Sequence, residues 1–203
     1  MDRGRCGTYN FAHVVLSQCQ QSRFNRQSRS GTDSADTRCQ PPPKQYATHG
    51  RANPVGIPYL YLGSLPETAA AEIRPHTGEV ACVAEFQVLP PLAAVDLRDP
   101  RKLVSPFVLG DAGAIGQLRA DIPFLEKLGE ELTRPVLPRS AAIDYIPSQY
   151  LCEFIKKSGY DGVAFRSSVS SGMNLALFSP AKARGLSVTR YNINRVSVDV
   201  APA

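Results

Sequence analysis

The order of apolar and polar positions after about residue 41 predicts short strands interleaved with a few helices. Two-residue alternation and β-branched or aromatic content mark the strand candidates. They are YLYL (59–62), EVACVAEFQV (79–88), AAVDLR (93–98), DGVAFR (161–166), LALF (175–178) and VTRYNINRVSVDV (188–200). The helix candidates are the alanine-rich segment after Pro66, LRADIPFLEKLGEEL (118–132) and PSQYLCEFIKKSG (147–159).

Capping and breaker residues set the expected ends of the first helix. Ser64 and Glu67 match the S-x-x-E capping box, in which both side chains bond backbone N–H groups at the start of a helix. The alanines that follow favour a helix, and Pro75 cannot continue one. We therefore expect a short helix between Ser64 and Pro75, with Glu67 used for capping.

The other two helices are predicted from apolar spacing and from their breakers. In segment 118–132, Pro123 predicts an early interruption, because proline cannot donate a backbone hydrogen bond. In segment 147–159, Gly159 is placed to end the helix as a C-terminal cap. The apolar residues at helical spacing in this last segment are Tyr150, Leu151, Phe154 and Ile155, as in a helix with one apolar face.

Strands with few helices between them predict a single compact domain of the mixed α+β class. A doubly wound α/β sheet would need a helix after each strand, and this pattern lacks them. No G-x-G-x-x-G or G-x-x-x-x-G-K-[ST] motif follows a strand, which disfavours Rossmann and P-loop nucleotide sites. At 203 residues, 43% of them apolar, the chain can bury a core without disulfides or metal.

Positive charge is concentrated near the N-terminus. The net charge is +5, and residues 1–44 hold seven Lys/Arg against three Asp, a net of +4. No apolar periodicity accompanies this charge, and PPPK at 41–44 favours an extended segment. We expect residues 1–40 to be a basic, flexible leader and residues 41–203 to be the folded domain. Nucleic-acid binding by this leader is the less favoured alternative, because no periodic pattern places its positive charges on one face of a helix or strand.

Cysteine usage and hydropathy favour a soluble protein of the reducing cytoplasm. The chain has five cysteines, an odd number, and none of them forms a C-x-x-C motif. None lies at the spacing from a histidine that is typical of zinc ligands. We therefore expect neither a disulfide framework nor a metal site. No run of eighteen apolar residues is present, so no membrane span is expected.

Three polar residues of the segment GRANPVGIPYLYLGSLPETAAAEIRP (50–75) are candidates for binding or catalysis. Arg51 lies in a loop of Gly, Asn and Pro that can fix its guanidinium group, which suits phosphate or carboxylate. Tyr61 shares a strand face with Tyr59, and two such rings can hold a planar base. Glu72 could stabilise positive charge on a sugar ring. The structural alternatives are a surface arginine, a core tyrosine and an exposed glutamate.

The loop RSSVSSGMN (166–174) is a second candidate site, because loops that follow strands often carry function. Its serine hydroxyls, its backbone N–H groups and Arg166 together could hold phosphate oxygens. A Ser/Gly-rich hairpin loop is the structural alternative. Arg74 closely follows Glu72 and could anchor that carboxylate or bind an anion.

Three ordered blocks of the sequence resemble the RES-domain family, which is named after an arginine, a glutamate and a serine. The blocks are GRANPVGIPYLYLGS, ETAAAEIRP and YIPSQYLCEFIKKSGYDGVAFRSSVSSGMNLALF. The resemblance extends from residue 41 to residue 178. It implies a toxin of a bacterial toxin–antitoxin pair, with a fold similar to that of ADP-ribosyltransferase toxins and with NAD as its substrate.

Carried over by position, the resemblance makes Arg51, Tyr61 and Glu72 the catalytic residues. The substrate-binding residues expected in such a domain are Arg26, Ser167, Ser168, Arg74 and Asn174. Of the two adjacent serines, the first is our choice for the family serine, and the second is the alternative. Arg26 is the best counterpart of an upstream family arginine, but asparagine replaces the aromatic residue expected beside it.

The implied chemistry is cleavage of the nicotinamide–ribose bond of NAD, without metal or bound cofactor. Arg51 and Arg26 would hold the pyrophosphate, and Tyr61 would pack against the nicotinamide or its ribose. Glu72 would stabilise oxocarbenium character, and Ser167 would position ribose or phosphate. Water as acceptor gives hydrolysis, inorganic phosphate gives phosphorolysis, and a protein side chain gives ADP-ribosylation. The sequence leaves these three open.

The resemblance also implies a protein partner. That partner is an antitoxin with a helix-turn-helix domain, which would occlude the pocket and through which oligomers could form. Membrane association and direct binding of nucleic acid are not expected. An alternative of a different class is a basic nucleic-acid-binding module, or an interaction domain that keeps the fold without activity.

Overall fold

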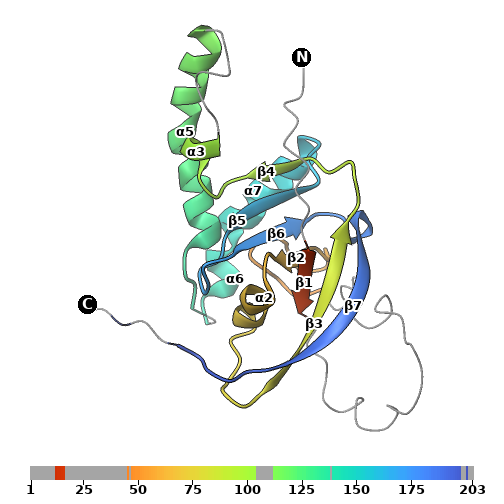
Figure 1. Cartoon of the computed structure of the whole chain (residues 1–203). Coiled ribbons are helices and arrows are strands. Elements are labelled where there is room, and N and C mark those ends of the chain that lie inside the picture. Colours follow the sequence, from red (N-terminus) through yellow and green to blue (C-terminus); the bar gives the residue numbers. More distant parts are fainter. Residues whose placement is uncertain are drawn as a thin grey trace.

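One mixed sheet of seven strands organises the described part of the chain, in the order β4-β5-β6-β2-β1-β3-β7 (Figure 1). This computed structural model describes residues 12–16, 45, 47–103, 112–137, 139–197 and 200. The strands are β1 (Ala12–Leu16), β2 (Leu60–Gly63), β3 (Val80–Val88), β4 (Ala94–Asp96), β5 (Gly162–Arg166), β6 (Met173–Leu177) and β7 (Ala183–Asn192). Among these strands, β4 and β5 run parallel and the other neighbours are antiparallel.

The described helices are α2 (Pro66–Glu72), α3 (Pro100–Leu103), α5 (Ala112–Thr133), α6 (Ala141–Asp144) and α7 (Ile146–Lys157), with a short 3-10 turn, η3 (Pro180–Lys182). The helices that contact this sheet, α2, α5 and α7, lie on one of its faces, while α3 packs on α5 and α6 on α7. Both α5 and α7 pack against β5, while α2 packs against β1, β2 and β3 (Figure 1). Gly63 of β2 and Glu85 of β3 lie opposite the same residue of β1. Because side chains alternate along each strand, the residues of β3 that face α2 lie on the same face of the sheet as Tyr61 of β2.

Side-chain alternation divides the core between the two faces of the sheet. Tyr59 packs with Val163, Phe165 and Ala176 against the buried residues of α7. The neighbouring residues of β2, Leu60 and Leu62, point the other way, into a second cluster. The buried residues of that cluster are Leu60, Leu62, Ala84, Phe86, Ala164, Leu175 and Leu177. These elements confirm the predicted mixed α/β class and single domain.

The helix ends differ from the sequence prediction at α2. The predicted capping box does not form, because Leu65 is the N-cap and no side chain caps the helix. The hydroxyl of Ser64 instead accepts a hydrogen bond from the backbone N–H of Met173, at 3.1 Å. A tertiary contact with the β5–β6 loop therefore uses the group that local sequence assigned to capping. Glu67 is left as an exposed residue of the first turn.

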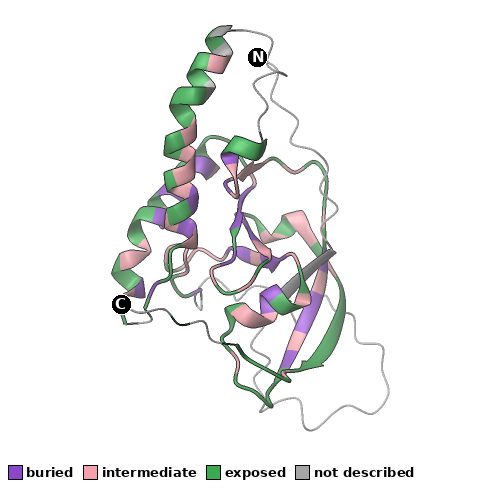
Figure 2. Cartoon of the chain, turned by 60° about the vertical axis from the view of Figure 1, so that its left-hand side comes forward, coloured by how far each residue is buried: buried purple, intermediate pink, exposed green. Residues whose placement is uncertain are grey.

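Pro123 does not interrupt α5, contrary to the prediction. The helix continues through it for 22 residues. Arg119, whose carbonyl loses its helical partner at Pro123, is exposed, so water can satisfy that carbonyl. Figure 2 shows that the half of α5 around Pro123 is largely exposed, whereas its C-terminal half contains the buried Gly129 and Leu132.

The apolar residues of α7 do not share one buried face. Leu151 and Ile155 are buried as predicted, but Tyr150 and Phe154 are 78% and 61% exposed. The buried side of the helix instead includes Cys152, which belongs to the core cluster around Tyr59. Gly159 has φ 88°, as expected for the residue that ends the helix in the left-handed conformation.

Part of the predicted leader lies inside the sheet. Residues 12–16 form β1, which pairs with both β2 and β3. The alternation of AHVVL is too short to separate a strand from the surrounding polar sequence, which explains why it was assigned to the leader. The other residues of 1–40 lie outside the described part of the chain, where the flexible leader stays a prediction.

Candidate functional site

The loop after residue 49 is tied to β2 through the hydroxyl of Tyr61. This hydroxyl donates to Oδ1 of Asn53 at 2.7 Å and accepts from the N–H of Ala52 at 2.9 Å. The amide nitrogen of Asn53 donates to the carbonyl oxygens of Thr48, Pro54 and Ile57. A Cβ atom on Gly50 would lie 2.4 Å from Asn53 Oδ1 and 2.7 Å from the Tyr61 hydroxyl oxygen. Glycine is therefore required where these two side chains meet.

Arg51 extends from this loop onto the helical layer. Its Nη1 donates to the carbonyl oxygen of Arg134 at 2.7 Å, and its guanidinium carbon lies 5.3 Å from the ring centroid of Tyr145. The loop backbone is held by α7, because Ser148 Oγ donates to the Arg51 carbonyl at 2.6 Å and Gln149 Nε2 donates to the preceding carbonyl at 2.8 Å. The position of Arg51 is thus fixed by its backbone as well as its side chain.

Glu72 is joined to the β5–β6 hairpin by two hydrogen bonds. Ser167 Oγ donates to Glu72 Oε1 at 2.8 Å, and Asn174 Nδ2 donates to the same oxygen at 2.6 Å. Ser167 and Asn174 are buried, whereas the glutamate is exposed. Glu72 Oε2 accepts no hydrogen bond from the described residues. One carboxylate oxygen is therefore fixed by the hairpin, and the other has no hydrogen-bond donor among the described residues.

Close approach of the β5–β6 loop to α2 makes these contacts geometrically feasible. Ser170 Oγ of this loop donates to Oγ1 of Thr68, a residue of α2, at 2.9 Å. A Cβ atom on Gly172 would lie only 2.0 Å from Thr68 Oγ1 and 2.9 Å from Ser64 Oγ. The absence of a side chain at Gly172 lets the hairpin reach the helix that ends at Glu72.

An open cleft of about 600 Å³ lies beside this hairpin. It is lined by Ser64, Leu65, Arg98, Arg166, Ser167, Ser170, Ser171, Gly172 and Met173. Ser167 therefore both lines the cleft and donates to Glu72, which is not itself a lining residue. Two guanidinium groups and no carboxylate belong to the described lining, a composition that suits an anionic ligand.

A comparison with family models shows the family of this chain. The model described as "RES domain" matches residues 21–199. The chain belongs to the RES-domain family. The match includes residues 21–40, which the sequence interpretation placed in the leader, and it includes the three sequence blocks that carry the resemblance.

The structure of this RES domain has a distant neighbour among solved structures. The neighbour is the M. tuberculosis MbcT–MbcA toxin–antitoxin complex, with 12% sequence identity, a TM-score of 0.45, and coverage of 91% of this chain and 85% of that chain. Comparison with curated proteins finds no match. Within the described residues, no helix is long and apolar enough to cross a membrane, and no group of three His, Cys, Asp or Glu could hold a metal ion.

The structure brings some of the predicted site residues of this RES domain together. Glu72, Ser167 and Asn174 form one hydrogen-bonded group. Tyr61 lies on the same sheet face, because it is opposite Ala176, two residues from Asn174. Its hydroxyl is turned to the Asn53 loop. Their roles in substrate binding and catalysis stay predictions.

Other predicted residues are placed apart from this group. Arg51 contacts the helical layer and does not belong to the cleft lining. Arg74 is exposed, with φ 50° just after α2, and the Ser168 side chain makes no hydrogen bond to described residues. Arg26 lies outside the described residues.

Sequence reasoning missed two residues that shape the site. Asn53 was interpreted only as a turn former, although its buried side chain joins four partners. Arg98 was assigned to a strand end without a role, yet it lines the cleft. The available signal was the Asp96-x-Arg98 spacing at the end of AAVDLR, which lets the carboxylate orient the guanidinium group.

Proposed function

We propose that this RES domain is an enzyme that cleaves the nicotinamide–ribose bond of NAD, as the toxin of a toxin–antitoxin pair. The observation that carries the proposal is the orientation of Glu72, one oxygen of which accepts hydrogen bonds from Asn174 and from Ser167, a residue of the cleft lining. Two donors keep the carboxylate in one orientation, which is what electrostatic stabilisation of a developing positive charge requires. Membership of the RES-domain family supports the assignment.

The proposed reaction breaks the C–N bond between ribose and nicotinamide. The electron pair of that bond leaves with nicotinamide, which becomes neutral, and positive charge develops on the ribose ring. Glu72 Oε2 would face this oxocarbenium-like centre, while Oε1 stays bound to its two donors. An acceptor oxygen then forms the new bond to ribose and releases its proton to solvent. Positioning and charge stabilisation are sufficient, because nicotinamide is a good leaving group.

The acceptor determines the name of the reaction. Water would yield ADP-ribose, and inorganic phosphate would yield ADP-ribose carrying a new phosphate ester at the anomeric carbon. A protein side chain would yield ADP-ribosylation, which is the alternative activity. A protein antitoxin would neutralise the enzyme by covering the cleft, in keeping with the complex named for the distant structural neighbour.

The decisive experiment compares Glu72→Gln with Glu67→Gln. Glutamine at position 72 can still accept both hydrogen bonds at its amide oxygen but carries no charge. Glu67 is an exposed glutamate of the same helix and serves as the matched control. NAD loss and product masses are followed in buffers with and without inorganic phosphate. We expect a fall of about 100- to 1,000-fold for Glu72→Gln and no change for the control.

Three results would decide against the proposal. Intact NAD in every buffer with the wild-type chain rules out hydrolysis and phosphorolysis. Intact NAD also in the presence of protein acceptors rules out ADP-ribosylation. Equal activity of Glu72→Gln and Glu67→Gln would show that the charge on Glu72 does not stabilise the transition state.

A further inference from the structure

Arg98 and Arg166 are brought side by side by the parallel strands β4 and β5. The register places Asp96 opposite Ala164, so each arginine lies two residues beyond a matched pair. Neighbouring strands are about 4.8 Å apart, and the ends of parallel strands meet at the same edge of a sheet. Met173 of β6 is opposite Arg166 and accepts a hydrogen bond at its Sδ from Arg98 Nη1, at 2.8 Å. Three adjacent chain segments thus define one edge of the cleft.

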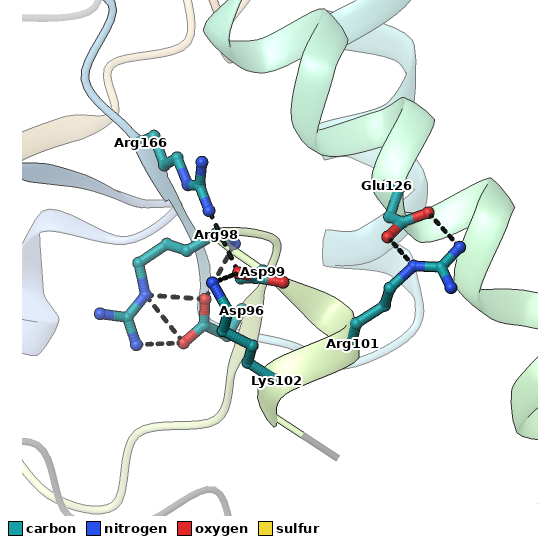
Figure 3. A network of polar contacts seen from close by, with 7 residues as sticks. All are labelled: Asp96, Arg98, Asp99, Arg101, Lys102, Glu126 and Arg166. Atoms are coloured by element: carbon teal, nitrogen blue, oxygen red, sulfur yellow. Dashed lines mark hydrogen bonds and ion pairs between the residues drawn. The ribbon is translucent and has the colours of Figure 1, made fainter. Parts of the chain in front are cut away.

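Carboxylates of the β4 end orient both guanidinium groups (Figure 3). Arg98 Nε donates to Asp96 at 2.9 and 3.0 Å, and Arg98 Nη2 donates to the same carboxylate. Arg166 Nη2 lies 3.3 Å from Asp99 Oδ2, which also lies 2.8 Å from Lys102 Nζ. The hydrogen bond from Lys102, helped by the nearby charge of Arg166, keeps the pKa of Asp99 below its usual range. Among the described residues at this end of β4, three cations therefore contact two carboxylates.

The two guanidinium groups are held to different degrees. The Arg98 side chain is 25% exposed, whereas that of Arg166 is 60% exposed and has Asp99 as its partner. Arg166 can therefore turn towards a ligand by giving up one long ion pair. Ser170 and Ser171 add hydroxyl groups to the same cleft. Guanidinium groups and hydroxyls that line one cleft are donors of the kind that bind phosphate oxygens.

We infer that Arg98 and Arg166 form a subsite for a phosphate oxyanion in this cleft. Ser167 connects the subsite to Glu72, because it lines the same cleft as the two arginines and donates to that carboxylate. Its role in turnover rests on the proposed NAD cleavage, but its binding of an anion does not. Two sources supply the same chemistry: the pyrophosphate of NAD, and free inorganic phosphate acting as the acceptor.

The test measures binding of two probes to the full chain by isothermal titration calorimetry. The probes are inorganic phosphate and ADP-ribose, each at low and high NaCl. Arg166→Ala is compared with Arg101→Ala, a matched control in which an exposed arginine of the next helix loses its pairing with Glu126. We expect Arg166→Ala to weaken probe binding by about 10- to 100-fold, the loss of one charge-assisted contact, and the control to leave it unchanged.

Asp99→Asn gives a second readout with the opposite sign. Removing this carboxylate releases Arg166 and raises the local charge by one, so phosphate should bind roughly 3- to 10-fold tighter. Arg98→Lys keeps the charge but not the two-pronged geometry, and it should weaken binding while the fold is retained. A purely structural cluster would give weaker or unchanged binding in Asp99→Asn.

The pattern over the two probes identifies the source of the oxyanion. If both the inorganic phosphate and the ADP-ribose affinities fall in Arg166→Ala and the probes compete, the subsite takes the substrate pyrophosphate. If only phosphate binding falls, the subsite takes the acceptor. Equal affinities in wild type, Arg166→Ala and Arg101→Ala overturn the inference. Two outcomes separate this inference from the proposed function. If Glu72→Gln loses NAD cleavage but still binds phosphate, the subsite does not depend on the charge of Glu72. If the wild-type chain leaves NAD intact but binds phosphate through Arg166, the subsite stands and the proposed NAD cleavage does not.

Discussion

Replacing Tyr61 by phenylalanine tests how the Arg51 loop is held. The change removes one oxygen atom and leaves the ring in its place against the core cluster. Burial raises the pKa of Tyr61, so the hydroxyl is protonated at neutral pH and donates to Asn53 while it accepts from Ala52. Without it, Asn53 Oδ1 and the Ala52 N–H both lose a partner in an interior where Asn53 is only 4% exposed.

The magnitude follows from these two unsatisfied groups. Leaving one buried polar group without a partner costs about 1 to 3 kcal/mol. Two such groups, with some relaxation of the loop, predict a loss of about 2 to 4 kcal/mol in the free energy of unfolding. For a chain of this length, that corresponds to a fall in Tm of roughly 6 to 12 °C.

The matched control is Tyr59→Phe, one residue before β2 and part of the same core cluster. Its hydroxyl donates to Glu153, which keeps Lys156 as an ion-pair partner and is 30% exposed at its side chain. Water can replace that bond, so we expect a cost of only about 0.5 to 1.5 kcal/mol. Urea unfolding followed by circular dichroism measures both variants. Equal costs for the two variants, or a larger cost for Tyr59→Phe, would refute the assigned role of the Tyr61 hydroxyl.

Two glycine substitutions should act in opposite directions. Gly172→Ala places a Cβ atom 2.0 Å from Thr68 Oγ1, so the β5–β6 loop must move from α2. We expect a loss of about 1 to 3 kcal/mol in unfolding free energy and a fall in NAD turnover, because Ser167 is drawn away from Glu72. Gly116 lies on the exposed part of α5, where an added Cβ atom would lie within 4 Å of no described atom outside its own turn of helix. Thermal unfolding of Gly116→Ala should show a gain of about 0.5 to 1 kcal/mol from helix propensity, with turnover unchanged.

Strands β2 to β6 could be predicted from the sequence because each one carries its signal within a few residues, whereas the final strand was expected at 188–200 and β7 spans Ala183–Asn192. Leu60 and Leu62 point to one cluster and Tyr59 to the other, as two-residue alternation requires. The same rule fails for β1, whose five residues give too short a pattern. That strand is held in place by pairing with β2 and β3, which are distant in sequence.

Local motifs failed where a tertiary partner competed for the same group. The Ser64 hydroxyl was assigned to a capping box, but it accepts the Met173 N–H, 109 residues away. The apolar spacing of α7 does not distinguish Leu151 from Tyr150, because only the packed structure shows which side meets the sheet. In both places, a local pattern fits more than one arrangement, and long-range packing selects between them.

The arginines of the site show the same limit with a functional consequence. Arg51 could be selected from its unusual loop, and the structure holds it against the helical layer. Arg98 sits at the end of an ordinary strand pattern, and its importance depends on the register between β4 and β5, which the sequence alone does not specify. A functional arginine in a distinctive loop motif is therefore easier to predict from the sequence than an arginine whose position depends on strand pairing.

The Arg166–Ser167 dipeptide links the two proposed halves of the site. Successive residues that continue a strand point to opposite sides, which here sends Arg166 to Asp99 and Ser167 to Glu72. The anion-binding and sugar-facing groups are therefore coupled through one backbone segment. Inserting a single residue after Phe165 would exchange the two directions, so we expect it to weaken both phosphate binding and NAD cleavage, whereas Arg166→Ala should spare the Glu72–Ser167 contact.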